Sequence, residues 1–220
     1  PKSGVGKTCQ ECHMPSPVAW KGQTITNVAP GKGGIERNPV SIHSHRMTID
    51  ETLLRASLTM KASAVATNGS VTVRVAITND KTGHHVPTDS PLRQLILIVD
   101  GKDGQGNSLI LKDGPRLPDW CGKGDRRQGY YAGLAGKAYA KLLQELWTDV
   151  FPTGAYWNHT TVVSDNRIAA FATDRSSYSF AMPRAGKALI TVTLLYRRAY
   201  KELMDWKKWT DPDVTIATEH

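Results

Sequence analysis

The stretch Gly69-Ser-Val-Thr-Val-Arg-Val-Ala-Ile-Thr-Asn79 decides the fold class, because its apolar side chains recur at every second position. The apolar positions are Val71, Val73, Val75 and Ile77, and the positions between them include Thr72 and Arg74. Successive side chains of a β-strand point to opposite faces of its sheet. The alternation therefore predicts a strand with one buried and one exposed face, as in an antiparallel sheet packed on a core.

Other segments outside this stretch also have strand character. Strands are predicted at residues 93–100, 108–112, 160–164, 177–182 and 187–197. The last of these is apolar on both faces, which is typical of a central strand. Several short strands separated by turn-rich segments predict a mainly β protein with the architecture of a β-sandwich.

Helical patterns are few. Residues 48–58 read as a short helix that Asp50 caps, and residues 132–147 carry leucine and alanine at helical spacing. Residues 198–209 predict an amphipathic helix that packs Leu203, Trp206 and Trp209 against the sandwich. Its basic residues are either a solvated face or a docking face, namely Arg197, Arg198, Lys201, Lys207 and Lys208. The expected fold is a β-sandwich with a few short helices, one of them near the C-terminus.

The composition limits the classes of partner. The chain of 220 residues is 40% hydrophobic and carries a net charge of +8 with histidine neutral. No apolar run approaches the roughly 18 residues of a membrane span, so we expect none in this chain. A basic surface suits an acidic protein, anionic lipid or nucleic acid, but no nucleic-acid-binding motif accompanies the charge, and we expect no nucleic-acid partner.

The chain opens at Pro1 without an apolar leader, which suits a mature form, a fragment or part of a longer protein.

A cysteine–histidine motif occurs near the start of the chain, in Thr8-Cys9-Gln10-Glu11-Cys12-His13-Met14-Pro15. Cys-x-x-Cys-His is the attachment motif of c-type haem. The thiols of Cys9 and Cys12 add to the haem vinyl groups, and His13 becomes the proximal iron ligand. A zinc site would need two further ligands nearby, and a thioredoxin-like site would need a βαβ setting that does not surround this segment. One covalent haem c is the favoured interpretation.

The second axial ligand of the iron could come from several places. His43 and His45 follow the attachment motif after a loop rich in glycine, proline and asparagine, at residues 24–39. His84 and its neighbour His85 lie in a turn after the first predicted strand. Met47 and Met60 are further possibilities, whereas Met14 adjoins the proximal ligand and is poorly placed for the opposite face.

Several motifs occur in an order that resembles a known family. After the haem motif come Ser44-His45-Arg46-Met47, then Asn79 with Gly83-His84-His85-Val86-Pro87-Thr88, then Ser164-Asp165-Asn166-Arg167-Ile168 and Leu195-Tyr196-Arg197-Arg198. This order is similar to the C-terminal part of multihaem c-type cytochromes from anaerobic and respiring bacteria. There, a haem-bearing segment runs into an immunoglobulin-like β-domain.

The resemblance implies a haem-binding segment at residues 1–60 and an immunoglobulin-like β-sandwich with a C-terminal helix at residues 61–220. It implies His45 as the distal ligand of a bis-histidine haem, with His43 and then His84 as alternatives. It also implies a location in the periplasm or at the cell surface, because c-type haem is attached outside the cytoplasmic membrane. In that setting the single remaining thiol, Cys121, is expected to be buried.

Three functions fit these observations. The first is an electron carrier, not an enzyme, which presents its haem to a redox protein or to a larger electron-transfer complex, including other haem-bearing chains. The second is a haem enzyme with an open sixth position that acts on a small oxidant or oxyanion, with His84, His85 or Arg46 as acid–base or anion-binding groups. The third is an assembly subunit in which the sandwich docks the haem into a larger complex.

Overall fold

The computed structural model describes residues 6–45, 50–67, 69–88, 90–182 and 187–220. The chain divides into two compact units, Pro1–Asp50 and Glu51–His220. The division falls earlier than the boundary after residue 60 that the sequence suggested. The reason is that α2 (Glu51–Ala56) contacts strand β12 (Val214–Glu219) of the second unit, where Arg55 donates to the carbonyl oxygen of Thr215.

The first unit consists mostly of loops joined by short elements. It contains α1 (Cys9–His13), the strand pair β1 (Ala19–Trp20) and β2 (Gln23–Thr24), and the 3-10 turns η1 (Pro30–Lys32) and η2 (Pro39–Ser41). Asn27 holds one of these loops closed, since its side chain donates to the carbonyl oxygen of Gly34 and accepts from the backbone of Ala29. The loop-rich character expected of this part of the chain is confirmed.

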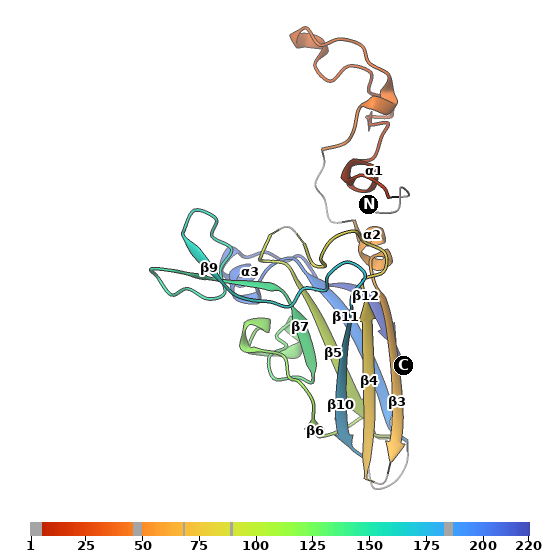
Figure 1. The fold of residues 1–220 in the computed structure, drawn as a ribbon, viewed down its shortest axis with the longest axis vertical. Helices are drawn as coiled ribbons and strands as arrows, with labels where there is room; N and C mark the ends of the chain where they lie inside the picture. Colours follow the sequence, from red (N-terminus) through yellow and green to blue (C-terminus); the bar gives the residue numbers. More distant parts are fainter. Residues whose placement is uncertain (1–5, 46–49, 68, 89, 183–186) are drawn as a thin grey trace. The chain divides into compact units, whose positions relative to one another are not determined.

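The second unit is built on two four-stranded antiparallel sheets, whose long strands are seen in Figure 1. The first sheet has the order β3 (Thr59–Thr67), β4 (Ser70–Thr78), β10 (Thr173–Ala181) and β6 (Leu111–Asp113). The second has the order β12, β11 (Leu189–Arg197), β5 (Gln94–Lys102) and β7 (Gly136–Tyr139). Apolar side chains of both sheets form one core, so the expected mainly β sandwich is confirmed.

The alternating apolar residues of β4 face the core, as predicted. Val73 and Ile77 are fully buried in this core, whereas Arg74 on the other face is exposed. Strand β11 is central, as its two apolar faces predicted, because β12 and β5 flank it. A second apolar cluster covers the outer face of β5, where Ile96 and Ile98 pack with Leu117 and Cys121.

The helix predicted at residues 132–147 is wrong. This segment instead forms β7 and β8 (Lys141–Glu145). Gly136 explains the difference, since a Cβ atom there would collide with the carbonyl oxygen of Leu97 on the neighbouring strand β5. Gly133, just before β7, has a positive φ of 81°, which a helix does not allow.

The remaining predictions agree with the structure in position and differ at their ends. The strand expected at residues 108–112 overlaps β6 only at Leu111 and Lys112, and the one expected at 177–182 is part of the longer β10. The helix expected at residues 48–58 is α2 in the described residues, and the one expected at 198–209 is α3 (Lys201–Lys207). Its predicted packing is wrong for Trp206 and Trp209, which are exposed, whereas Leu203 is partly buried. Strands β3 and β12 were not predicted from the sequence.

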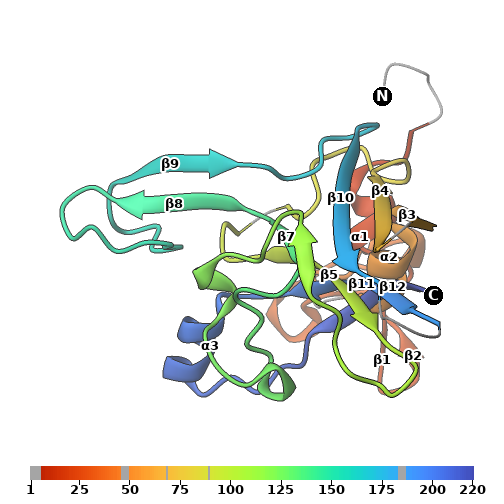
Figure 2. The same ribbon diagram turned by 90° about the horizontal axis from the view of Figure 1, so that it is seen from below.

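A hairpin outside the two sheets projects from the sandwich (Figure 2). It consists of β8, β9 (Thr160–Asp165) and the loop between them, and we call residues 141–165 the arm. Asn166 fixes its base: its side-chain nitrogen donates to the carbonyl oxygen of Ala138 at 2.7 Å, and its side-chain oxygen accepts from the backbone nitrogen of Ala140 at 2.8 Å. Asn166 thereby links the end of the arm to strand β7.

Candidate haem-attachment site

The two cysteines of the haem motif lie on a short helix with a well-defined beginning. Thr8 is the N-cap of α1, and its hydroxyl accepts from the backbone of Glu11 at 3.3 Å. The carboxylate of Glu11 accepts in turn from the backbone nitrogen of Thr8, which completes a capping box and lowers the pKa of Glu11. This local signal starts a helix in which Cys9 and Cys12, three positions apart, share one face.

The chemistry of this donor set fits haem c. The side chains of Cys9, Cys12 and His13 are exposed, and neither thiol forms a disulfide in the described part of the chain. No residue of α1 is buried. A five-residue helix has little stability of its own. An exposed pair of thiols beside a histidine leaves one whole face of the helix for a group attached to it.

The first unit also lacks an apolar core. Among residues 6–45 and Asp50, Ile42 is the only buried residue. Four large apolar side chains of the unit are exposed, namely Trp20, Val28, Ile35 and Val40. Since apolar burial is the main favourable contribution to folding, a unit of this kind needs a further apolar body to pack around.

The first histidine segment lies beside the attachment helix. The backbone nitrogen of Ser44 donates to the carbonyl oxygen of Pro15 at 3.0 Å, and His43 Nδ1 lies 2.8 Å from the carbonyl oxygen of Met14. Because a carbonyl oxygen only accepts, His43 Nδ1 is the donor in this bond. The structure thus brings together the two parts of the sequence predicted to supply the proximal and distal ligands.

His45 follows this contact directly. Its side chain is exposed, and within the described residues no group hydrogen-bonds to its ring. Met47 lies outside the described residues. Met60 is buried in the core of the second unit, where it packs among the sandwich side chains, so it does not serve as an iron ligand.

The second histidine segment has a different setting, in the loop after β4. Asn79 is completely buried, and its side-chain nitrogen donates to the carbonyl oxygens of His84 at 2.8 Å and Ile168 at 2.9 Å. Thr82 donates to the side-chain oxygen of Asn79 and to the carbonyl oxygen of His84. The ring of His84 is exposed, with Nδ1 2.9 Å from the carbonyl oxygen of His85. The backbone of this segment is therefore held by Asn79, a residue of the family motif whose structural role the sequence did not predict.

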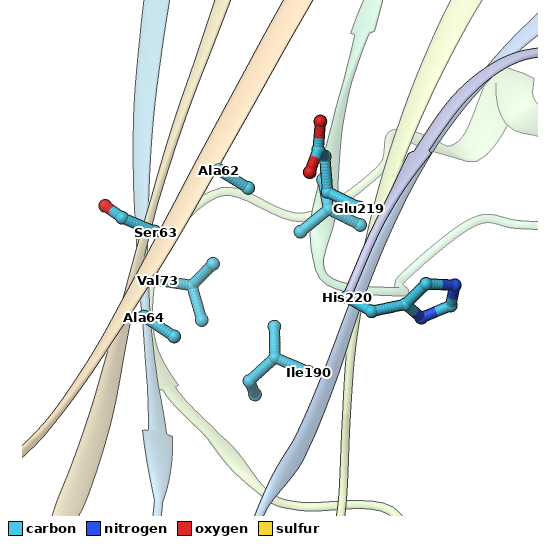
Figure 3. A pocket seen from close by; sticks show the side chains of 8 residues that line it. Ala62, Ser63, Ala64, Val73, Ile190, Glu219 and His220 are labelled. Carbon is cyan, nitrogen blue, oxygen red and sulfur yellow. The ribbon is translucent and has the colours of Figure 1, made fainter.

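A small cavity opens between the two sheets of the sandwich, at the edge where β3 and β12 lie (Figure 3). Its volume is about 40 Å³, and Val73 and Ile190 point toward one another across it, whereas the His220 ring points away. None of the residues that line it is a predicted site residue. Its size and apolar lining suit no cofactor of the dimensions of haem.

A buried arginine organises the outer side of β11, a role that the sequence did not predict. Arg197 has a 1% exposed side chain and forms two hydrogen bonds with the carboxylate of Asp213, at 2.8 and 2.7 Å. It also donates to the carbonyl oxygens of Cys121 and Gly129. Burial acts to lower the pKa of Arg197, but the carboxylate of Asp213 outweighs it and holds the pKa above its usual value. The motif Leu195-Tyr196-Arg197-Arg198 therefore has a structural role in this fold.

Cys121 lies in the same region and is fully buried, as expected. Burial raises the pKa of its thiol to about 12. Its thiolate is therefore scarce at neutral pH, and the thiol is unreactive compared with the exposed Cys9 and Cys12.

Comparison with known proteins gives a structural relative. No protein-family model matches the chain, and no curated protein sequence matches it. The solved structure of a penta-haem cytochrome c552 from Thermochromatium tepidum is similar, with a TM-score of 0.58 over 99% of this chain and 21% sequence identity. The chain spans about half of that protein, 48% of its length. The likeness establishes a common fold.

Proposed function

We propose that the chain is a c-type cytochrome that carries electrons through one haem attached to Cys9 and Cys12. The observation that carries this proposal is in the first unit, where a haem-attachment motif on a helix without buried residues coincides with an almost complete lack of buried side chains among the described residues. The exposed apolar side chains of this unit would then pack against the haem. The fold shared with a penta-haem cytochrome supports the same assignment.

His13 and His45 are proposed as the two axial ligands. A distal ligand has to reach the face of the haem opposite His13. His43 is the less suitable candidate, because its ring is hydrogen-bonded to the backbone of Met14, the residue that follows His13. His45 is two positions further along and has an exposed ring. His43 then acts as a positioning residue that holds the segment bearing His45 next to the attachment helix.

This ligand set favours an electron carrier over a haem enzyme. A haem with two histidine ligands exchanges single electrons and has no open position at which a substrate binds iron. The chain's own part in this process is to hold the thioether sulfurs and the two imidazoles in place. His84 and His85 are not needed in this account, since the contacts of Asn79 and Thr82 give their segment a structural role.

The proposal includes the setting of the protein. We infer that the chain corresponds to the haem-plus-immunoglobulin-like C-terminal part of a multihaem cytochrome, in the periplasm or at the cell surface. Its electron-transfer partner would be a redox protein or other haem-bearing polypeptide of a larger complex. None of the helices in the described part of the chain has the length and apolar character of a membrane span.

The test is the visible spectrum of the chain produced in a host that attaches c-type haem. The proposal predicts low-spin ferric and ferrous spectra and no reaction of the reduced protein with carbon monoxide. A high-spin ferric haem that binds carbon monoxide would show an open sixth position. That result would contradict the carrier and favour the enzyme.

A further inference from the structure

The turn that ends helix α3 exposes two tryptophans and two lysines in succession. Trp206, Lys207, Lys208 and Trp209 are all exposed, Trp206 by 74%. The turn is a well-formed helix end: Lys208 is in the left-handed conformation with φ of 55°, and the backbone nitrogen of Trp209 donates to the carbonyl oxygen of Met204 at 2.8 Å. Met204 is buried and anchors the helix. The fold therefore fixes these four side chains at the surface.

The two lysines of this turn are available to an anionic partner. Lys201 and Arg198 are paired with Asp205 and Asp211, but within the described residues neither Lys207 nor Lys208 has a carboxylate partner. The amine nitrogen of Lys207 lies 4.1 Å from the centre of the Trp206 ring. Cation and aromatic ring thus form one amphipathic surface, which we call the Trp–Lys turn (residues 206–209).

A second exposed aromatic cluster forms the tip of the arm, at residues 146–159. Trp147, Phe151, Tyr156 and Trp157 are exposed there, Tyr156 by 92%. The tip is held by the carboxylate of Glu145, which accepts hydrogen bonds from the side chains of three tip residues, Thr148, Thr153 and Asn158. These aromatic side chains are therefore exposed on a loop that hydrogen bonds to Glu145 hold in place.

The arm and helix α3 lie on the same side of the sandwich in both views (Figures 1 and 2). Their bases are packed together, since Leu142 of the arm and the preceding Ala140 belong to one apolar cluster with Leu203 of the helix and its N-cap residue Tyr200. Trp120 completes this contact with its ring edge-on to Tyr200, the ring centres being 6.0 Å apart. The shared cluster joins the base of the arm to the base of α3.

The composition of these surfaces points to a lipid surface as the occupant. Tryptophan and tyrosine are the residues enriched at membrane–water interfaces, where one end of the ring is apolar and the other is wet. Lysine is enriched on membrane-binding surfaces but depleted in the cores of protein–protein interfaces. The net charge of +8 has the sign that anionic lipid attracts. The proposal does not depend on the haem, because every residue involved lies in the second unit.

We propose that the Trp–Lys turn and the tip of the arm dock this chain on an anionic lipid bilayer. Lys207 and Lys208 bind lipid phosphates, while the exposed aromatic rings of both surfaces enter the headgroup region. The chain rests on the surface of the bilayer in this mode and does not cross it.

The experiment measures flotation of the purified chain with vesicles of phosphatidylcholine alone and of equal parts phosphatidylcholine and phosphatidylglycerol. The wild type is expected to float with the anionic vesicles and to be released as salt is added. The double variant Lys207→Glu/Lys208→Glu should lower the partition coefficient by about tenfold or more. The double variant Trp147→Ser/Trp157→Ser should weaken binding to the same vesicles by removing the inserted rings.

Matched controls change similar groups at other positions of the second unit. Lys61→Glu/Lys102→Glu makes the same charge change on exposed strand positions, and Ile110→Ser removes a large exposed apolar side chain just before β6. Both controls should bind nearly as the wild type does, and circular dichroism shows that each variant is folded. Failure of the wild type to float with anionic vesicles would overturn the proposal, as would an equal loss in the Lys61→Glu/Lys102→Glu control. Light scattering that shows a dimer dissociated by Trp157→Ser, without vesicle binding, would identify a contact between copies instead.

Discussion

His43 Nδ1 lies 2.8 Å from the carbonyl oxygen of Met14, and this bond fixes the first histidine segment beside the residue that follows His13. It joins positions 29 residues apart in the sequence. The bond also occupies the ring of His43 with the backbone next to His13. The two histidines of this segment are therefore expected to differ in role, with His43 positioning and His45 ligating.

Alanine substitutions separate these roles. His45→Ala should convert the low-spin haem to a high-spin form that binds carbon monoxide, because the iron loses its sixth ligand. His43→Ala should keep the low-spin spectrum but lower the midpoint of thermal loss of that spectrum, since the segment is less firmly held. His84→Ala should leave both properties unchanged. Absorption and electron paramagnetic resonance spectra of the three variants provide the check, and a high-spin His43→Ala with a low-spin His45→Ala would reverse the assignment.

The buried pair of Arg197 and Asp213 should contribute strongly to the stability of the sandwich. Arg197→Ala leaves a carboxylate and two backbone carbonyls without their donor, so a loss of about 3–5 kcal/mol in the free energy of unfolding is expected. Urea unfolding followed by circular dichroism measures this loss. Arg198→Ala is the matched control, because Arg198 pairs with Asp211 at the exposed surface, and such pairs contribute about 1 kcal/mol or less. Equal losses in the two variants would contradict the role of Arg197.

Asn79 should be important for stability although it touches no cofactor. Asn79→Ala removes the donors to the carbonyl oxygens of His84 and Ile168 inside a buried site, which is expected to cost about 2 kcal/mol or more. The same unfolding measurement tests it against Asn107→Ala, because the side chain of Asn107 bonds to Asp103 in an exposed turn. An unchanged stability of Asn79→Ala would show that the loop after β4 does not depend on this side chain.

The tip of the arm should loosen in acid. Hydrogen bonds from Thr148 and Thr153, and a further one from Asn158, lower the pKa of Glu145 below its usual value of 4.5. A lowered pKa in the folded state stabilises the tip above this value, and the stabilisation is lost as the pH falls through the folded-state pKa. Near-ultraviolet circular dichroism of the tip tryptophans should therefore change below about pH 4.5.

The matched variant for this effect is Glu145→Gln, which keeps the shape of the side chain and cannot titrate. Its spectrum should vary much less over the same pH range. If the wild type and Glu145→Gln change in parallel as the pH falls, another group controls the arm.

The sequence was most informative where the physical signal is local. The alternation in residues 69–79 follows from the period of a strand, and the haem motif is set by the spacing of two covalent bonds and one ligand. The segment of residues 132–147 shows where local patterns mislead, since Leu134, Ala138 and Leu142 have helical spacing but lie in or beside two separate strands. Gly136 decided the outcome through a close approach to Leu97, which no local pattern contains.

Contacts between distant residues were beyond prediction for the same reason. The bond from His43 to the backbone of Met14 depends on how the intervening loop closes. Arg197 stood in a recognised motif, but its burial depends on Asp213 and on the loop that carries Cys121 and Gly129. Strand β3 went unrecognised because its central residues, Ala62, Ser63 and Ala64, are too small to show an apolar alternation.

The covalent haem is the central claim, and intact-mass spectrometry of the denatured chain tests it most directly. Produced in a host that attaches c-type haem, the chain should carry the added mass of one haem and show one titratable thiol, Cys121, after unfolding. Cys9→Ser/Cys12→Ser should keep the mass of the bare chain under the same conditions. A wild-type chain without added mass and with three titratable thiols would contradict the account.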